Sequence, residues 1–195
     1  MWLPAAAAVV FILDFFTKWI ALRDLHAMPG ITIGLGDFVM PSPSLVELLQ
    51  TAPVYRVPVI TGWFDLYLQR NTGGAFSLLD NYPFVIMGVS SVAMIWIYMW
   101  SRKLPKQAWL ARLTMGMILG GAVGNLIDRV RFHFVIDFFH FYRGEWYWPT
   151  FNIADCGIVV GVAGFVYLSL FTKLLEPPEQ PASDTASESK PEDQA

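Results

Sequence analysis

The chain of 195 residues is 55% hydrophobic and only 15% charged, and its mean hydropathy is +0.46. These values lie well outside the usual range of soluble domains, so they exclude a soluble globular protein and indicate an integral membrane protein. The net charge of −3 comes from the last twenty residues, which hold six acids and one base. The single cysteine excludes an intramolecular disulfide.

Four runs with few or no charges are long enough to cross a bilayer, which needs about 20 helical residues. They lie at about 3–22, 82–100, 109–127 and 151–172. The first run contains Asp14 and Lys18 and has no basic residues before it, which argues against a cleaved signal peptide. We therefore expect four transmembrane helices.

The orientation of these helices follows from the short loop SRKLPKQAWLAR, which has four bases in twelve residues. Such a loop is retained in the cytoplasm. Both termini are then cytoplasmic, and two longer loops, 23–81 and 128–150, lie outside. The C-terminal segment 176–195 is rich in Pro, Ser and Glu, so it is expected to be a disordered cytoplasmic tail.

The outer loops are expected to contain a small sheet. Residues 63–70 alternate apolar and polar side chains, which is typical of a half-buried strand. The segment TIGLGDFVM, residues 32–40, is a candidate partner strand. The predicted fold class is an all-α membrane protein whose four transmembrane helices have a small β-sheet and loop region on the outer, periplasmic face.

Polar residues within or beside the spans are the main functional signal, because an ionisable group in hydrocarbon is costly. Asp14 and Lys18 are four residues apart, so they share a helix face and can form an ion pair, which a structural role would explain equally well. Asn125 and Asp128 lie at the outer end of the third helix. Three glycines clear one face of that helix for close packing: Gly120, Gly121 and Gly124.

Six polar residues are expected to gather at the outer ends of the third and fourth helices: Asn125, Asp128, Arg129, Asp137, Asn152 and Asp155. The histidines form no metal-binding motif and Cys156 has no local base, so neither a metal site nor a cysteine nucleophile is expected. Two adjacent carboxylates that share a proton can activate water for attack on a peptide carbonyl. Asp155 is the firmest member of such a pair, and Asp128 and Asp137 can each be its partner.

Two other classes of function fit acids near a membrane. A proton-coupled transporter uses intramembrane acids, but here they gather at one face, and four helices without an internal repeat suit alternating access poorly. A non-catalytic scaffold is the second alternative. It predicts that the aspartates can be replaced without loss.

Five short motifs follow one another along the chain: LDFFTK (13–18), RNTGGAFS (70–77), GNLIDR (124–129), VIDF (135–138) and FNIAD (151–155). Their order and topological places resemble those of the lipoprotein signal peptidases, the type II signal peptidases of bacteria. The resemblance implies that Asp137 and Asp155 form a catalytic dyad. It implies that five residues support the dyad or contact substrate: Asp14, Asn71, Asn125, Arg129 and Asn152. Asp128 would be structural, held by Arg129 or by backbone at the helix end.

A member of this family cleaves diacylglyceryl-modified prolipoproteins just before the lipidated cysteine and needs no cofactor. The resemblance implies a peptidase domain over residues 1–175 in the bacterial inner membrane, with its site near the periplasmic face. We expect a monomer whose partners are the prolipoprotein substrates and membrane lipids, and no nucleic acid. Against the family pattern, the first outer loop is longer by about two dozen residues, Gly74 replaces a common alanine, and Cys156 replaces a small hydroxyl residue.

Overall fold

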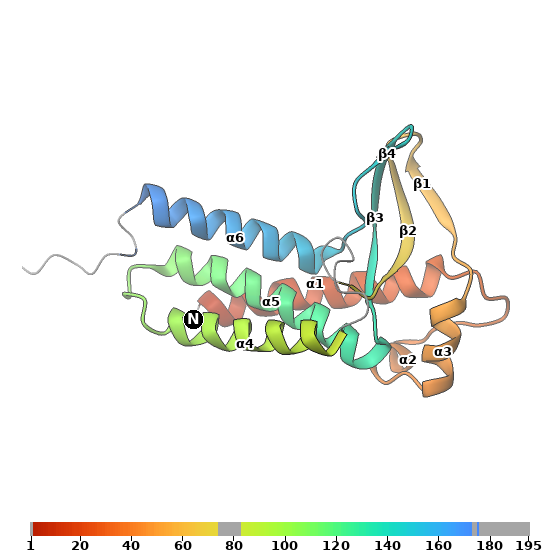
Figure 1. Ribbon diagram of the computed structural model, residues 1–195, viewed down its shortest axis with the longest axis horizontal. Helices are drawn as coiled ribbons and strands as arrows, with labels where there is room; N and C mark the ends of the chain where they lie inside the picture. Colours follow the sequence, from red (N-terminus) through yellow and green to blue (C-terminus); the bar gives the residue numbers. More distant parts are fainter. Residues whose placement is uncertain (1, 74–82, 173–174, 176–195) are drawn as a thin grey trace, which may run out of the picture.

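The computed structural model describes residues 2–73, 83–172 and 175. Four of its helices are long and apolar enough to cross a membrane: α1 (Trp2–Leu25), α4 (Pro83–Ser101), α5 (Trp109–Phe132) and α6 (Ile153–Phe171). They run along the long axis of the molecule, and a sheet with two short helices covers one end (Figure 1). The architecture expected from the sequence is therefore confirmed, whereas the predicted tail, 176–195, lies outside the described residues.

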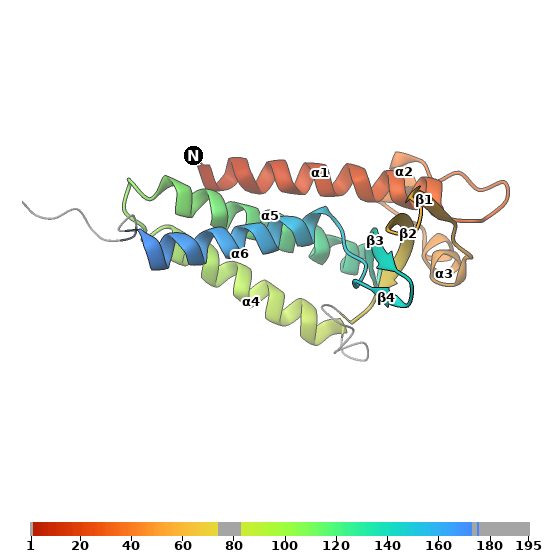
Figure 2. The ribbon, with the colours of Figure 1, turned by 90° about the horizontal axis from the view of Figure 1, so that it is seen from above.

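Helix α5 is the centre of the bundle. It packs against α1, α4 and α6, and Figure 2 shows it between α1 and α6. The three predicted packing glycines serve two neighbours and not one: a Cβ at Gly120 would meet the backbone of Ala7 in α1, and one at Gly121 would meet the carbonyl of Ala154 in α6. The absent side chains thus let α1 and α6 approach α5 closely.

Helix α5 ends at Phe132, five residues beyond the predicted end at 127. Asp128 and Arg129 therefore belong to the helix and not to the predicted loop 128–150. The helix continues past Asp128 because this carboxylate is paired with Lys18 and Arg131, as described below. His133 then ends it in the left-handed conformation, with φ of 65°.

The outer region contains a four-stranded antiparallel sheet in the order β1-β2-β3-β4. Its strands are β1 (Arg56–Ile60), β2 (Phe64–Asn71), β3 (Val135–Arg143) and β4 (Trp146–Tyr147). The strand predicted at 63–70 is confirmed as β2. Strand β3 lies within a segment predicted as loop, because its first four side chains, Val135 to Phe138, are buried on both faces and show no alternation.

The strand predicted at 32–40 is wrong, because residues Leu35–Val39 form the short helix α2. Asp37 Oδ2 accepts a hydrogen bond from the Gly34 amide at 3.0 Å and so caps this helix. A second short helix, α3 (Pro43–Thr51), begins at Ser42, whose Oγ accepts from the Leu45 amide at 3.2 Å. The two glycines of the segment thus belong to a helix start and not to a strand.

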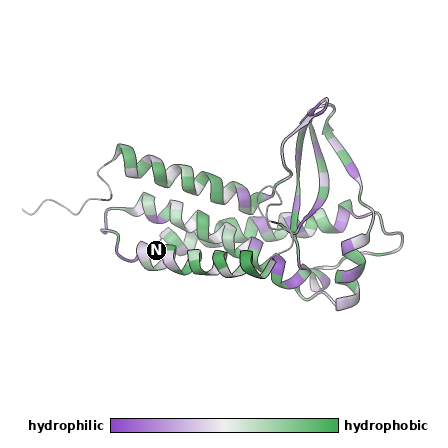
Figure 3. Ribbon diagram, viewed as in Figure 1, coloured by the Kyte–Doolittle hydropathy of each residue, from purple (hydrophilic) through white to green (hydrophobic). Residues whose placement is uncertain are grey.

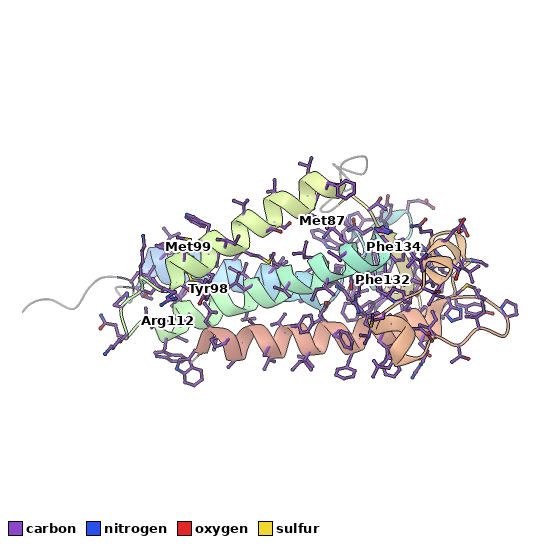
Figure 4. All side chains as sticks on the ribbon, turned by 90° about the horizontal axis from the view of Figure 1, so that it is seen from below. Met87, Tyr98, Met99, Arg112, Phe132 and Phe134 are labelled. Carbon is purple, nitrogen blue, oxygen red and sulfur yellow. The ribbon has the colours of Figure 1, made fainter. Side chains whose placement is uncertain are left out.

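An apolar core joins the sheet to the ends of α1 and α5. It includes Leu22, Phe38, Leu49, Phe132 and Ile136, all at most 1% exposed. Phe132 and Phe134 lie where α5 passes into β3 (Figure 4). Figure 3 shows mostly hydrophobic helices, with hydrophilic bands where they approach the sheet. These bands contain the polar residues of the candidate site.

Candidate active site

Asp137 lies in β3 beside the end of β2. The pairing of Asn71 with Val135 puts Asn71 and Asp137 on the same face of the sheet. Asn71 Nδ2 donates to Asp137 Oδ2 at 2.9 Å, and Asn152 Nδ2 donates to Asp137 Oδ1 at 2.7 Å. Asp137 is only 1% exposed, so the two amides fix the orientation of a buried carboxylate.

Asp155 is held at the start of α6 by a capping box. Asn152 is the N-cap: its Oδ1 accepts from the Asp155 amide at 2.9 Å, and Asp155 Oδ2 accepts from the Asn152 amide at 3.2 Å. The remaining oxygen, Asp155 Oδ1, accepts from Asn125 Nδ2 at 2.8 Å. The helix start therefore fixes Asp155, as the sequence predicted.

Amide side chains connect the two carboxylates. Asn152 Nδ2 contacts Asn125 Oδ1 at 3.1 Å as well as Asp137 Oδ1. Because Asn125 in turn donates to Asp155, two asparagines form a continuous chain of hydrogen bonds from one aspartate to the other. The sequence placed Asn125 and Asn152 near the aspartates but did not indicate this order of contacts.

A buried cluster of charged side chains contacts Asn125 and the first turn of α6. Lys18 Nζ contacts Asp14 Oδ2 at 2.8 Å, Asp128 Oδ2 at 2.9 Å and Asn125 Oδ1 at 2.8 Å. These three acceptors match the three protons of the ammonium group, which is 0% exposed. Asp14 Oδ1 also accepts from the Ala154 amide at 2.8 Å, in the first turn of α6. The predicted pair of Asp14 and Lys18 is confirmed.

Of the two contacts predicted for Asp128, the one with backbone near the end of α5 is confirmed, whereas among the described residues its ion pair is with Arg131 and not with Arg129. Asp128 Oδ1 pairs with Arg131 Nη2 at 3.1 Å, three residues further along α5, and Asp128 Oδ2 accepts from the Ile136 amide at 3.4 Å. Arg129 instead donates from Nη1 to the Asn125 carbonyl at 3.3 Å. Spacing explains the difference, since side chains three residues apart on a helix are neighbours and adjacent ones are not.

Arg129 faces the two aspartates of the site. It is 8% exposed, and its charge acts on both Asp137 and Asp155. Its Nε is buried and has no hydrogen-bond partner among the described residues. A donor in this position is available to an acceptor that enters from outside the protein.

The environment of Asp137 favours its protonated form. Burial, and next the charge of Asp155, raise the pKa of Asp137 to about 7, although the amides of Asn71 and Asn152 oppose this rise. At neutral pH the group therefore exchanges a proton readily.

Within the described residues, no group of three His, Cys, Asp or Glu side chains could hold a metal ion.

All seven predicted site residues lie in one connected region where the bundle meets the sheet: Asp14, Asn71, Asn125, Arg129, Asp137, Asn152 and Asp155. A family model described as signal peptidase (SPase) II matches residues 6–171. The chain belongs to the signal peptidase II family. Membership implies a membrane peptidase that removes signal peptides, which decides against the transporter and scaffold alternatives.

The chain covers most of the length of its relatives. A lipoprotein signal peptidase of Nitratidesulfovibrio vulgaris (strain DP4) is 37% identical over 160 residues, 80% of this chain and 81% of that protein. One of Geobacter sulfurreducens is 43% identical over 134 residues, 66% of this chain and 83% of that protein. A bacterial membrane enzyme solved by the in meso method at 1.9 Å shares the fold, with a TM-score of 0.59 and 23% identity over 86% of this chain and 91% of its own.

Proposed function

We propose that this protein is an aspartyl endopeptidase that removes the signal peptides of diacylglyceryl-modified prolipoproteins by cleaving just before the lipidated cysteine. Asp137 and Asp155 are its catalytic pair. The observation that carries the proposal is the chain of amide hydrogen bonds that joins these two carboxylates and leaves both without an ion-pair partner among the described residues.

The reaction needs one protonated and one ionised carboxyl group. The raised pKa makes Asp137 the proton donor at neutral pH. The ionised Asp155 removes a proton from water, the hydroxide adds to the scissile carbonyl carbon, and Asp137 gives its proton to the carbonyl oxygen. When the C–N bond then breaks, the proton held by Asp155 passes to the leaving amine, and the carboxylic acid product returns one proton to the pair.

The other site residues orient the pair and the substrate. Asn71 and Asn152 hold Asp137, while Asn125 holds Asp155. Arg129 has a buried Nε without a hydrogen-bond partner among the described residues, and its charge acts on both aspartates, so we assign it to a substrate carbonyl oxygen. Asp14 acts indirectly: its carboxylate accepts a hydrogen bond from the Ala154 amide and so anchors the first turn of α6.

The position of the pair suits a lipid-anchored substrate. The site lies where the bundle meets the sheet, so a scissile bond held near the headgroups by its own acyl chains arrives at this level (Figure 1). At the opposite end, the α4–α5 connection exposes Arg102, Lys103 and Lys106. We infer that this end is cytoplasmic, with both termini, and that the site faces the periplasm in the bacterial inner membrane.

The direct test measures cleavage of a diacylglyceryl-modified lipobox peptide by the purified protein, with the unlipidated peptide as a control. Asp137→Asn and Asp155→Asn should each reduce the rate at least about a thousandfold, because an amide can neither accept nor donate the required proton. Asp24→Asn, which alters an exposed acid outside the site, should cleave at the normal rate.

Asp128→Asn is the informative comparison. It should reduce the melting temperature, with a loss of rate of about tenfold, because it weakens a buried ion pair without removing a reacting group. If Asp137→Asn cleaves at a near-normal rate while a well-folded Asp128→Asn is inactive, the pair is instead Asp128 with Asp155.

A further inference from the structure

Residues 27–53, here called the outer module, form a segment at the outer end of the bundle whose two ends lie side by side. His26 and Val54 pair at its base, and the Ala27 amide donates to the Pro53 carbonyl at 2.8 Å. The module contains α2 and α3 (Figure 1). Its residues Phe38 and Leu49 belong to the same buried core as Leu22. The module is therefore packed against the membrane helices.

Arg131 connects the outer module to the buried charges. Its Nη1 donates to the Phe38 carbonyl at 2.8 Å, in the last turn of α2, and its guanidinium lies 4.5 Å from the centroid of the Phe38 ring. Its Nη2 contacts Asp128 at 3.1 Å. The same guanidinium lies over the ring of Phe132, which Figure 4 places at the outer end of α5. One side chain thus touches both the module and α5.

Asp128 in turn contacts the supports of both site aspartates. Its Oδ2 accepts from the amide of Ile136, the residue before Asp137. It also contacts Lys18, which donates to Asn125, the residue that holds Asp155. A displacement of the Asp128 carboxylate would therefore shift Asp137 through Ile136, and Asp155 through Lys18 and Asn125.

A second arginine makes a parallel connection. Arg70 Nη2 donates to the carbonyl of Ala52, the C-cap of α3. Arg70 directly precedes Asn71, which holds Asp137. The outer module is thus bonded at two points to segments that orient the site, although none of the site bonds described above comes from its own side chains.

Arg131 also balances the charge of the buried carboxylates. Asp14 and Asp128 face the single ammonium of Lys18, and Arg131 supplies the second positive charge. Without it, two buried carboxylates would share one cation, and their repulsion would move Asp128 or Lys18 from its present place.

We propose that Arg131 is a positioning residue for peptide cleavage: it ties the outer module to Asp128 and thereby fixes the supports of Asp137 and Asp155. The inference rests on the proposed peptidase activity. Small displacements of reacting groups slow chemistry more than they weaken substrate binding. Arg131→Gln should therefore reduce kcat about tenfold and leave KM unchanged.

The experiment measures kcat and KM with the lipidated peptide for the full chain in detergent, together with the fraction of folded protein. Arg131→Lys should retain an intermediate kcat. An ammonium keeps the charge beside Asp128 but lacks the planar guanidinium, whose two terminal nitrogens contact Phe38 and Asp128. The matched control is Arg23→Gln, which removes an arginine from an exposed ion pair with Asp24 and should match the wild type. The double variant Arg131→Gln/Asp128→Asn should have the kcat of Asp128→Asn alone, because Arg131 acts through that carboxylate.

A folded Arg131→Gln protein with wild-type kcat would overturn the inference, and so would a double variant in which the two losses multiply. If Arg131→Gln does not fold, the kcat of Arg131→Lys decides in its place, with the same double variant built on lysine. Failure of the wild type to cleave the lipidated peptide would refute the proposed function itself, and the inference with it. Cleavage by the wild type and Arg131→Gln alike would remove only the role of Arg131.

Discussion

The aspartates of this protein differ in the chemistry of their partners. Asp14 and Asp128 face Lys18, whereas Asp137 accepts from the amides of two asparagines. An amide orients a carboxylate without neutralising it, so Asp137 remains able to exchange a proton. This contrast separates structural from reactive acids better than burial does, because Asp14, Asp128 and Asp137 are each only 1% exposed.

The raised pKa of Asp137 predicts how cleavage depends on pH. Above about pH 7 Asp137 loses the proton that it must donate, so kcat/KM should fall as pH rises through this value. On the acid side the rate should fall again when the second carboxylate takes up a proton, and both limbs report the pair. A rate that stays constant up to about pH 9 would contradict the assignment of Asp137 as the acid.

The same pKa predicts a dependence of stability on pH. The folded protein holds the proton of Asp137 up to about pH 7, whereas the unfolded chain releases it near the ordinary aspartate pKa of 3.8. The free energy of unfolding should therefore decrease as pH rises between these two values. Thermal unfolding in detergent checks this. Asp137→Asn should show a flatter dependence, and an equal slope in both proteins would assign the effect to another group.

The transmembrane helices and the sheet were predictable to different degrees. Long apolar runs identified all four spans, because each is close to or above the roughly 20 helical residues that cross a bilayer. Strand β2 showed alternation, but β3 is covered on both faces and lacked it. The misassigned segment at 32–40 did contain a helix signal, since Gly34 with Asp37 three residues later is a capping pair.

The sequence predicted which residues gather in the candidate site but not their contacts. The motifs predicted seven site residues, which the structure brings together, and the four-residue spacing predicted the pair of Asp14 and Lys18. The bond from Lys18 to Asn125 joins residues 107 positions apart, and no local pattern encodes it. Similarly, Asp128 selects Arg131 over Arg129 because of the helix periodicity, which matters only once α5 is known to continue to Phe132.

Close packing of α5 leads to a prediction for Gly124. A Cβ at this position would fall on the Asp14 carboxylate, which holds Lys18 and the start of α6. Gly124→Ala should therefore destabilise the protein by about 1–3 kcal/mol and slow cleavage at least about tenfold. Gly88→Ala is the matched control in α4, since a Cβ there meets nothing within 4 Å. Equal melting temperatures for the two variants would show that α5 does not need this glycine.

The molecule as a whole has its sheet and its basic α4–α5 connection at opposite ends of the bundle. The sheet, α2 and α3 lie at one end, and the basic α4–α5 connection lies at the other with the start of α1 and the end of α6 (Figure 1). Helix α1 has 24 residues and is about 36 Å long at 1.5 Å per residue. It exceeds a hydrocarbon core of about 30 Å, so it is long enough to cross the membrane with some tilt.

The proposed orientation predicts which surfaces a reagent can reach. Single cysteines at Ser44 in α3 and at Gln107 in the α4–α5 connection, both exposed, should react from opposite sides of the membrane. A Cys156→Ser background removes the native thiol. In intact cells, an impermeant maleimide should label Ser44→Cys and leave Gln107→Cys unlabelled until the membrane is opened. The reverse result would place the site in the cytoplasm.

The ion pair of Asp14 and Lys18 bears on how the protein is made. A chain is synthesised from its N-terminus, so α1 enters the bilayer before α5 exists and before Asp128 can be a partner. An unpaired charge in hydrocarbon is costly, but these two charges lie one turn apart and neutralise each other within α1. When α5 has been inserted, Lys18 can also donate hydrogen bonds to Asp128 and Asn125. The ion pair thus allows α1, which carries Asp14 of the candidate site, to enter the membrane first and to pack against α5 and α6 afterwards.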